Sequence, residues 1–320
     1  MLPDAQEPPA GSGPPGGPPG VRLARLPPQS YFLVSAVFHY LGPSFAVLLF
    51  ARVPVLGMAW LRIVTAAAVF AVWRRPWRLA LRLDGPARWT LVQLGIVLAA
   101  MNSLCYLAVA RLPLSTVGAI EFLGTVLLAA LAARTRRNAL ALALTIAGVV
   151  TITDIRITGQ ALGFAFAFGN CGLFVLYVIL GHRIANVRVA GATSDGAVLN
   201  RVDQLNGIDQ LGASMLVAAV AVTPWGLGPA LRTFTHPVLL LAGAGVGVCS
   251  SVIPYVTDQL AMARLPRATF ALMLALLPVF ATIIGAIVLH QLPTGPDLAG
   301  IALVVAGVAL HQAPGQAAPG

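Results

Sequence analysis

Ten long apolar stretches make up most of this 320-residue chain, and arginines crowd every second connection between them. A helix needs about 20 apolar residues to cross a hydrocarbon core about 30 Å thick. Charged residues form only 9% of the chain, far below the roughly 25% of soluble domains. The sequence therefore predicts an all-α membrane protein with ten transmembrane helices. The predicted spans are Tyr31–Phe50, Val55–Trp73, Trp89–Ala110, Ser115–Ala133, Ala139–Thr153, Ala161–Leu180, Gln210–Leu227, Pro237–Ala261, Thr269–Leu289 and Leu298–His311.

The distribution of arginines predicts the orientation of these spans. With the N-terminus placed inside, 15 of the 20 arginines fall on the cytoplasmic side, four fall outside and Arg62 lies within a span. Cytoplasmic loops carry this excess of basic residues, and an even number of spans returns the C-terminus to the cytoplasm. Although the net charge is +10, the arginines form no basic face with interleaved aromatic residues, so no nucleic-acid partner is predicted.

One segment of the sequence occurs twice. Leu107–Thr116 and Leu260–Thr269 share seven of their ten residues, and a weaker echo pairs Ala147–Val149 with Ala306–Val308. The first copy of the longer segment connects predicted spans outside the cell, and the second does so inside. Because five spans is an odd number, we expect two inverted five-helix repeats, an arrangement that allows outward-open and inward-open states with substrate bound between the halves.

The expected domain organisation follows from the spans. Residues 1–30 are rich in Pro, Gly and Ala and are expected to form a disordered cytoplasmic tail; the first apolar run is long enough to span the membrane, unlike a signal peptide. The expected parts after it are a first repeat at 31–153, a linker at 154–160, a second repeat at 161–311 with a cytoplasmic loop at 181–209, and a C-terminal tail at 312–320.

Three polar residues are expected at one level in the outer half of the membrane. An ionisable group at the bilayer centre costs at least about 2.5–3.5 kcal/mol, so it should face a cavity or a partner. Glu121 lies roughly 10 Å from the outer end of its span by helical rise, and Arg62 and Asn102 reach a similar depth. We interpret them as a substrate or proton site, with Arg62 for a carboxylate and Glu121 for an ammonium group or a proton. The alternative is an ion pair that only joins helices.

Other polar residues in the spans are weaker candidates for the transport path. Asp258 lies about 12 Å from the cytoplasmic end of its span by helical rise; it either lines the path or neutralises the loop that holds Arg264 and Arg267. His39 and Asn170 either line the path or make hydrogen bonds between helices.

Pro254 interrupts the backbone hydrogen bonding of the eighth span, so a kink or a freed carbonyl is expected there. Cys105, Cys171 and Cys249 lie in predicted spans without metal-binding spacing, and we expect them to pack as small apolar residues. No metal or cofactor is predicted. The chain also lacks the nucleotide-binding and catalytic motifs of an enzyme. A passive channel fits less well than a carrier, because the polar groups are isolated at separate depths.

Several short motifs resemble the EamA family of the drug/metabolite transporter superfamily, and most closely its bacterial threonine/homoserine exporters. The motifs are Met101-Asn102, Tyr106, Pro113-Leu114, Glu121-Phe122, Gly124, Pro254-Tyr255, Asp258, Arg264-Leu265-Pro266 and Thr269-Phe270. The resemblance extends from about Tyr31 to His311. It implies an inner-membrane carrier that exports amino acids or related small metabolites, with protons as the expected coupling ion. A purine or toxic-compound exporter is the alternative.

The resemblance also implies roles for individual residues of this sequence. Arg62, Glu121 and Asp258 match charged positions of the family's motifs, and Tyr106 and Tyr255 join the expected path. Three positions depart from the pattern of close relatives: Val47 stands in place of a Lys, Leu277 in place of a Glu, and Thr125 in place of a Pro. The first two departures imply that the cavity loses one cation and one anion, which would change substrate preference.

Overall fold

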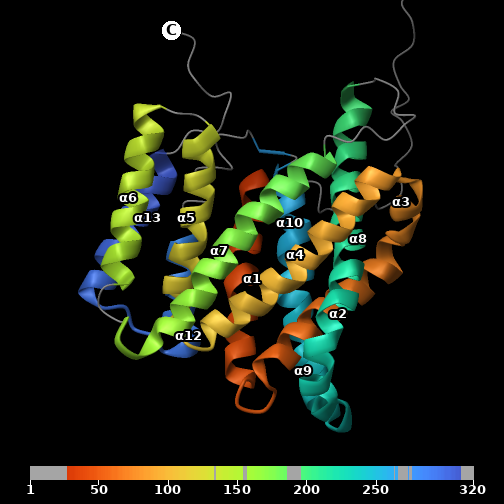
Figure 1. Ribbon diagram of the computed structural model, residues 1–320, viewed down its shortest axis with the longest axis horizontal. Coiled ribbons are helices and arrows are strands. Elements are labelled where there is room, and N and C mark those ends of the chain that lie inside the picture. The colour runs from red at the N-terminus through yellow and green to blue at the C-terminus, as the bar shows by residue number, and fades with distance from the viewer. Residues whose placement is uncertain are drawn as a thin grey trace, which may run out of the picture.

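The computed structural model describes residues 27–132, 135–153, 157–185, 196–262, 264–265, 273 and 276–310. Every regular element in this part of the chain is helical (Figure 1). The elements are α1 (Pro28–Leu49), α2 (Val55–Arg74), α3 (Trp77–Arg82), α4 (Gly85–Val109), α5 (Leu114–Ala132), α6 (Arg136–Thr153), α7 (Ile157–Ala185), α8 (Gly196–Ala230), η2 (Leu231–Thr235), α9 (Pro237–Gly247), η3 (Val248–Val252), α10 (Ile253–Met262), α12 (Leu277–Leu289) and α13 (Gly295–Leu310).

Within the described residues, six helices are long and apolar enough to cross a membrane. They are Gln29–Leu49, Val55–Arg74, Gly85–Val109, Gln160–Gly181, Gly207–Thr235 and Pro237–Ala261. Shorter apolar helices occur at Leu114–Gly124, Leu277–Leu289 and Gly295–Leu310. The all-helical class of the fold is confirmed, whereas ten membrane crossings in two inverted repeats remain a prediction.

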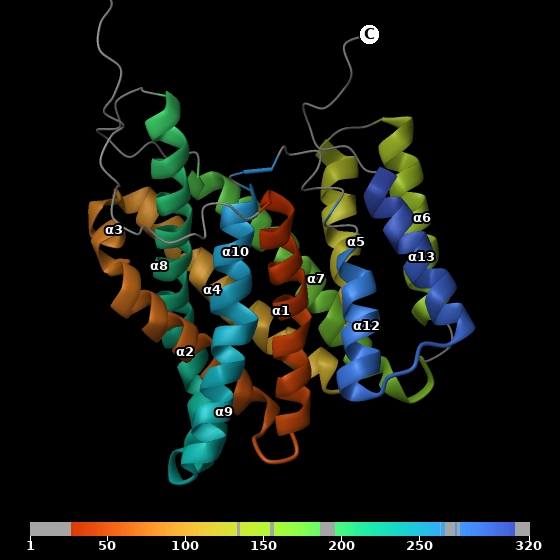
Figure 2. The same cartoon turned by 180° about the vertical axis from the view of Figure 1, so that it is seen from behind.

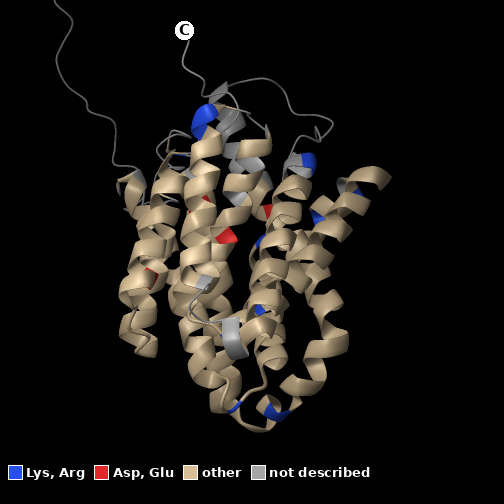
Figure 3. Ribbon diagram, turned by 60° about the vertical axis from the view of Figure 1, so that its left-hand side comes forward, with Lys and Arg blue, Asp and Glu red and all other residues tan. Residues whose placement is uncertain are grey.

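Large apolar side chains cover much of the outer surface of the bundle. Val72 is 84% exposed, and Val220 and Val238 are each 76% exposed. Contiguous apolar surface of this kind is unfavourable in water, and it is what a bilayer requires. The basic residues lie mainly toward the two ends of the helices (Figure 3). The structure therefore has the surface of a membrane protein.

The connection between α7 and α8 is shorter than the predicted cytoplasmic loop of residues 181–209. Helix α7 continues to Ala185 and α8 already begins at Gly196. Asp209, predicted to end the loop, is helical and forms an ion pair with Arg74 at the end of α2, with a 2.8 Å distance from Nε to Oδ1. The apolar spans themselves end at Gly181 and begin again at Gly207, so the additional helical turns are polar extensions that apolar runs do not reveal. A cytoplasmic location of this segment stays a prediction. Helix α7 also begins within the predicted linker 154–160. The predicted tails, 154–156 and 186–195 lie largely outside the described residues.

Helices α6 and α13 lie side by side at one edge of the molecule (Figures 1 and 2). A Cβ atom on Gly148 would lie 2.5 Å from the carbonyl oxygen of Gly300, and a Cβ on Gly307 would collide with Thr145. Both Gly148 and Gly307 belong to the weaker sequence echo. Small residues at these positions allow the two backbones to approach closely, as is common between membrane helices.

The two ends of the described chain lie at the same side of the bundle. The start of α1 and the end of α13 both lie at the upper edge in Figures 1 and 2. Arg137, near the start of α6, donates from Nε to the carbonyl oxygen of Leu310 at 2.8 Å. A cation at the C-terminal end of α13 also complements the helix dipole. This arrangement is compatible with an even number of crossings.

Candidate functional site

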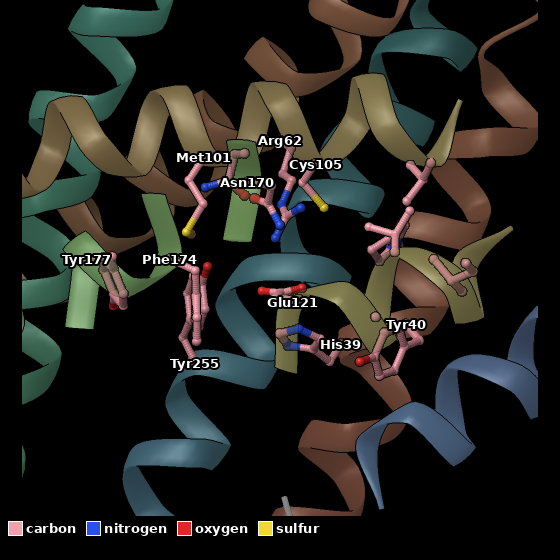
Figure 4. Close-up of a pocket in the computed structure, with 16 residues that line it drawn as sticks. His39, Tyr40, Arg62, Met101, Cys105, Glu121, Asn170, Phe174, Tyr177 and Tyr255 are labelled. Atoms are coloured by element: carbon pink, nitrogen blue, oxygen red, sulfur yellow. The ribbon is translucent and has the colours of Figure 1, made fainter. Parts of the chain in front are cut away.

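A cavity lies among α1, α2, α4, α5, α7 and α10 in the middle of the bundle (Figure 4). Six of the eight predicted path residues line it: His39, Arg62, Asn102, Glu121, Asn170 and Tyr255. The other lining residues are Tyr40, Pro43, Met101, Cys105, Val109, Leu114, Val117, Gly118, Phe174 and Tyr177. The cavity is therefore a mainly apolar and aromatic chamber with a small number of convergent polar groups, which is typical of a small-molecule site.

Arg62 is held in the cavity wall by the region around Pro254. Its Nε donates to Oγ of Ser251 at 2.9 Å, and its Nη2 donates to the carbonyl oxygen of Ser250 at 3.0 Å. Residues Val248–Val252 form a π-helical turn. Proline has no N–H, so Pro254 cannot donate to the carbonyl of Ser250, four residues earlier, as a residue of an α-helix would. The guanidinium of Arg62 donates to this carbonyl instead.

Tyr106 packs against the guanidinium of Arg62 and does not line the cavity. The guanidinium carbon of Arg62 lies 5.2 Å from the ring centroid of Tyr106, within the range of a cation–π interaction. The Tyr106 ring is fully buried and packs edge-on against Phe50 at a centroid distance of 5.8 Å. Tyr106 is not among the residues that line this cavity, and its place in the transport path stays a prediction.

Glu121 faces the cavity from α5, and its carboxylate has no hydrogen-bond or ion-pair partner among the described residues. In Figure 4 it lies between Arg62 and His39, close to Tyr255. Arg62 and Glu121 therefore share one chamber without the N–O distance of 4.0 Å or less that would make them an ion pair. Among the described residues, Arg62 and Glu121 thus form no ion pair that joins their helices.

Asn170 and two aromatic residues form one wall of the cavity on α7. Asn170 is 1% exposed, and neither atom of its side-chain amide has a hydrogen-bond partner among the described residues. Phe174 and Tyr177 follow on the same face, with their rings stacked at a centroid distance of 6.3 Å. Neither ring was among the residues predicted from the sequence. Their spacing of four and three residues from Asn170 is the signal that could have found them, because such positions share one helix face.

Asp258 does not line the cavity. It lies on α10 one turn after Tyr255, the residue of that helix that does face the chamber. The alternative expectation is that Asp258 neutralises the following loop. Within the described part of the chain, Asp258 forms no ion pair with Arg264. The guanidinium carbon of Arg264 instead lies 4.8 Å from the ring centroid of Tyr31. Arg267 lies outside the described residues.

The positions that depart from the exporter pattern do not change the charge of the cavity wall. Val47 is partly buried against the apolar core, and Leu277 is 8% exposed within that core. Neither residue lines the chamber, so the expected loss of one cation and one anion from it is not supported. The side chain of Thr125 lies outside the described residues. The three cysteines are free, and Cys105 lies in the cavity wall.

Residues 196–311 match the model of the EamA-like transporter family. The chain is also similar to the threonine/homoserine exporter RhtA of Salmonella typhimurium strain LT2, with 28% identity over 83% of this chain and 84% of the relative. The same exporter of Escherichia coli K12 is 27% identical over the same shares.

A solved crystal structure shares the fold of this chain. The two superpose with a TM-score of 0.53 at 20% identity, over 88% of this chain and 96% of the other. Together, the EamA match, the exporter relatives and the apolar helices indicate a membrane transporter rather than an enzyme.

Proposed function

We propose that this EamA-family protein exports small amino acids, of the kind that threonine and homoserine represent, across the bacterial inner membrane. The observation that carries the proposal is the central chamber, which contains one fixed cation and one carboxylate that are not paired with each other. A zwitterionic amino acid presents the complementary pair of charges. Its carboxylate would approach Arg62 and its ammonium group would approach Glu121.

Alternating access is the proposed mechanism, and the pattern of helix contacts supports it. Helix α1, first in the first predicted repeat, packs on α10 and α12, and α7, first in the second, packs on α4 and α5. The equivalent helices α2 and α8 pack on each other, as do α6 and α13. Reciprocal pairing of this kind is expected of two inverted halves that can exchange conformations around a central site.

The proposed orientation places the arginine-rich end of the bundle in the cytoplasm. Arg74 and Arg75 at the end of α2, and Arg136 and Arg137 at the start of α6, belong to this end. The start of α1 and the end of α13 lie on the same side (Figures 1 and 2). The positive-inside rule supports cytoplasmic termini for this arrangement.

Proton coupling is proposed to act through Glu121, and a substitution tests it. In proteoliposomes with an imposed pH gradient, Glu121→Gln should reduce gradient-driven threonine flux by about tenfold or more, because glutamine cannot bind and release a proton. Exchange of labelled for unlabelled threonine at equal pH should be affected less. Asp84→Asn is the matched control, since Asp84 caps α4 outside the cavity and asparagine caps a helix equally well.

Wild-type sensitivity to the pH gradient in Glu121→Gln would contradict this role. If the wild-type protein exchanges threonine but ignores the gradient, the export proposal stands and proton coupling is wrong.

A second candidate substrate class is flat, aromatic metabolites such as purines. The stacked rings of Phe174 and Tyr177 in the cavity wall favour it, because aromatic side chains bind planar rings well. Competition distinguishes the two classes. Excess adenine should leave threonine exchange unchanged if amino acids are the substrates, and should inhibit it if planar metabolites occupy the chamber.

A further inference from the structure

Asn170 is a buried polar side chain without a hydrogen-bond partner in the part of the chain that the structure describes. Both atoms of its amide are buried without a hydrogen bond among the described residues, although buried polar groups are nearly always paired. The other amide of the chamber differs: Asn102 donates from Nδ2 to the carbonyl oxygen of Leu98 at 2.8 Å. The amide of Asn170 therefore has a donor and an acceptor available to a ligand in the cavity that Arg62 and Glu121 also line (Figure 4).

The packing of α7 fixes the position of this amide. A Cβ on Gly169, the preceding residue, would lie 3.0 Å from Leu104 of α4. Cys171, the following residue, lies against Gly124 of α5, where an added Cβ would be 2.9 Å from its Sγ atom. Because α4 and α5 hold α7 on both sides of Asn170, the amide cannot withdraw from the chamber without moving the helix.

We propose that Asn170 selects the substrate by hydrogen-bonding to a polar group on its side chain. This inference rests on the proposed function, in which Arg62 and Glu121 bind the carboxylate and ammonium groups common to all amino acids. A hydroxyl group both donates and accepts, and it matches the two unpaired atoms of the amide. The preferred substrates are therefore small amino acids with a hydroxyl side chain. An apolar isostere leaves the amide unpaired, and a site of this kind discriminates against it.

Two isosteric pairs test the proposal in proteoliposomes. Threonine differs from valine, and homoserine from norvaline, by a hydroxyl in place of a methyl group. The wild-type protein should transport each hydroxylated member at least ~10-fold more efficiently, as kcat/KM, than its apolar isostere. In Asn170→Leu the preference should fall to within ~3-fold, mainly through slower threonine transport, and Asn170→Ser should keep part of it. Phe168→Leu is the control, because Phe168 is 43% exposed on the outer side of the same helix.

The outcomes separate this inference from the proposed function. If the wild-type protein moves none of the four amino acids, the proposed function fails. If it moves threonine and valine equally, or if an active Asn170→Leu keeps the wild-type ratio, export stands and the role of Asn170 is overturned. If Asn170→Leu does not fold, the wild-type ratio of threonine to valine transport still tests the proposal, because a ratio near one overturns it.

A second inference comes from the segment that occurs twice in the sequence. In the first copy, Arg111 donates from Nη1 to the carbonyl oxygen of Leu107 at 2.8 Å, and its guanidinium carbon lies 5.0 Å from the ring centroid of Phe166 on α7. In the second copy, Arg264 donates to Leu260 at 3.3 Å and lies over Tyr31 on α1. Each arginine therefore stacks on the first helix of the other predicted half.

The two contacts lie at opposite ends of the bundle. The connection between α4 and α5, which holds Arg111, is at the lower side in Figures 1 and 2, and the end of α10, near Arg264, is at the upper side. We infer that the two arginine–aromatic contacts are paired closing contacts, one for each face of the transporter. Opening one face requires the contact at that face to separate while the other holds, so each contact biases the equilibrium between the two open states.

Cys105 reports which face is open, because it is free and lies in the cavity wall. In a background with Cys171→Ala and Cys249→Ala, vesicles of both orientations would be treated with a membrane-impermeant maleimide. Arg111→Gln should raise labelling of Cys105 from the arginine-poor face by ~3-fold, and Arg264→Gln should raise it from the opposite face by a similar factor. Arg52→Gln is the control at the arginine-poor end, since Arg52 is exposed in the α1–α2 connection.

Labelling that rises from the same face in both variants, or that changes no more than in Arg52→Gln, would overturn this second inference. The assay measures accessibility rather than flux, so it is independent of the identity of the substrate.

Discussion

Arg62→Met should abolish amino-acid exchange, with a fall of about 100-fold or more, because it removes the cation proposed to bind the substrate carboxylate and also a structural donor. Arg62 is 5% exposed and holds the carbonyl of Ser250 and the hydroxyl of Ser251. A buried carbonyl left without a donor costs about 1–3 kcal/mol of stability. Methionine preserves much of the volume, so cavity formation is not the cause of either effect. Threonine exchange and thermal unfolding in detergent measure the two effects separately.

Two further variants show whether the structural part of this prediction is correct. Arg62→Lys keeps the charge but lacks the fork that reaches two acceptors, so it should fold and exchange threonine poorly. Pro254→Ala restores an N–H that can donate to the carbonyl of Ser250. Arg62→Met should therefore destabilise the Pro254→Ala background less than it destabilises the wild-type protein. Equal losses in the two backgrounds would show that the freed carbonyl does not matter, and wild-type exchange by Arg62→Met would refute the proposed carboxylate site.

Gly148→Ala should destabilise the protein by about 1–3 kcal/mol, although alanine is a better helix former than glycine. The added Cβ would lie 2.5 Å from the carbonyl oxygen of Gly300 and 2.8 Å from Cγ2 of Val304, so α6 and α13 would have to separate. The measurement is the midpoint of thermal unfolding in one detergent.

Gly172→Ala is the matched control for this substitution. Gly172 lies in the middle of α7 with nothing within 4 Å of an added Cβ, and it is exposed. At this position only the higher helix propensity of alanine should matter, and it should raise the free energy of unfolding by up to about 1 kcal/mol. Opposite signs for the two substitutions are therefore expected. Two stabilising changes would show that the α6–α13 contact is looser than the structure indicates.

The sequence predicted most helices because an apolar run long enough to span a bilayer is a strong local signal. It did not reveal where a polar segment continues a helix, as at Gly196–Asp209. It identified Arg62, Glu121 and Asn170 as candidates because polar groups in apolar spans are costly. Their shared presence in one chamber is a matter of helix packing, which a single sequence does not contain.

The errors at individual residues have the same origin. The motif that contains Tyr106 does not reveal that its ring packs against Arg62 and not in the cavity wall. Val47 and Leu277 were interpreted as losses of cavity charge, but their side chains belong to the apolar core. The role of Pro254 could be predicted in part, because a missing N–H follows from chemistry alone. The donor that replaces it comes from α2, almost 190 residues away along the chain, and only the fold reveals it.

The hydrogen bonds of Arg62 join α2 to the π-turn between α9 and α10, and Gly247 of α9 packs directly against the backbone of Arg62 and the side chain of Thr65. These contacts tie the positive charge to α2, α9 and α10, whereas the carboxylate of Glu121 belongs to α5. In the proposed alternating-access mechanism, sliding of α5 against the other three helices would change the distance from guanidinium to carboxylate. A substrate has a fixed length, so it would fit one such distance better than another and would favour one of the two open states.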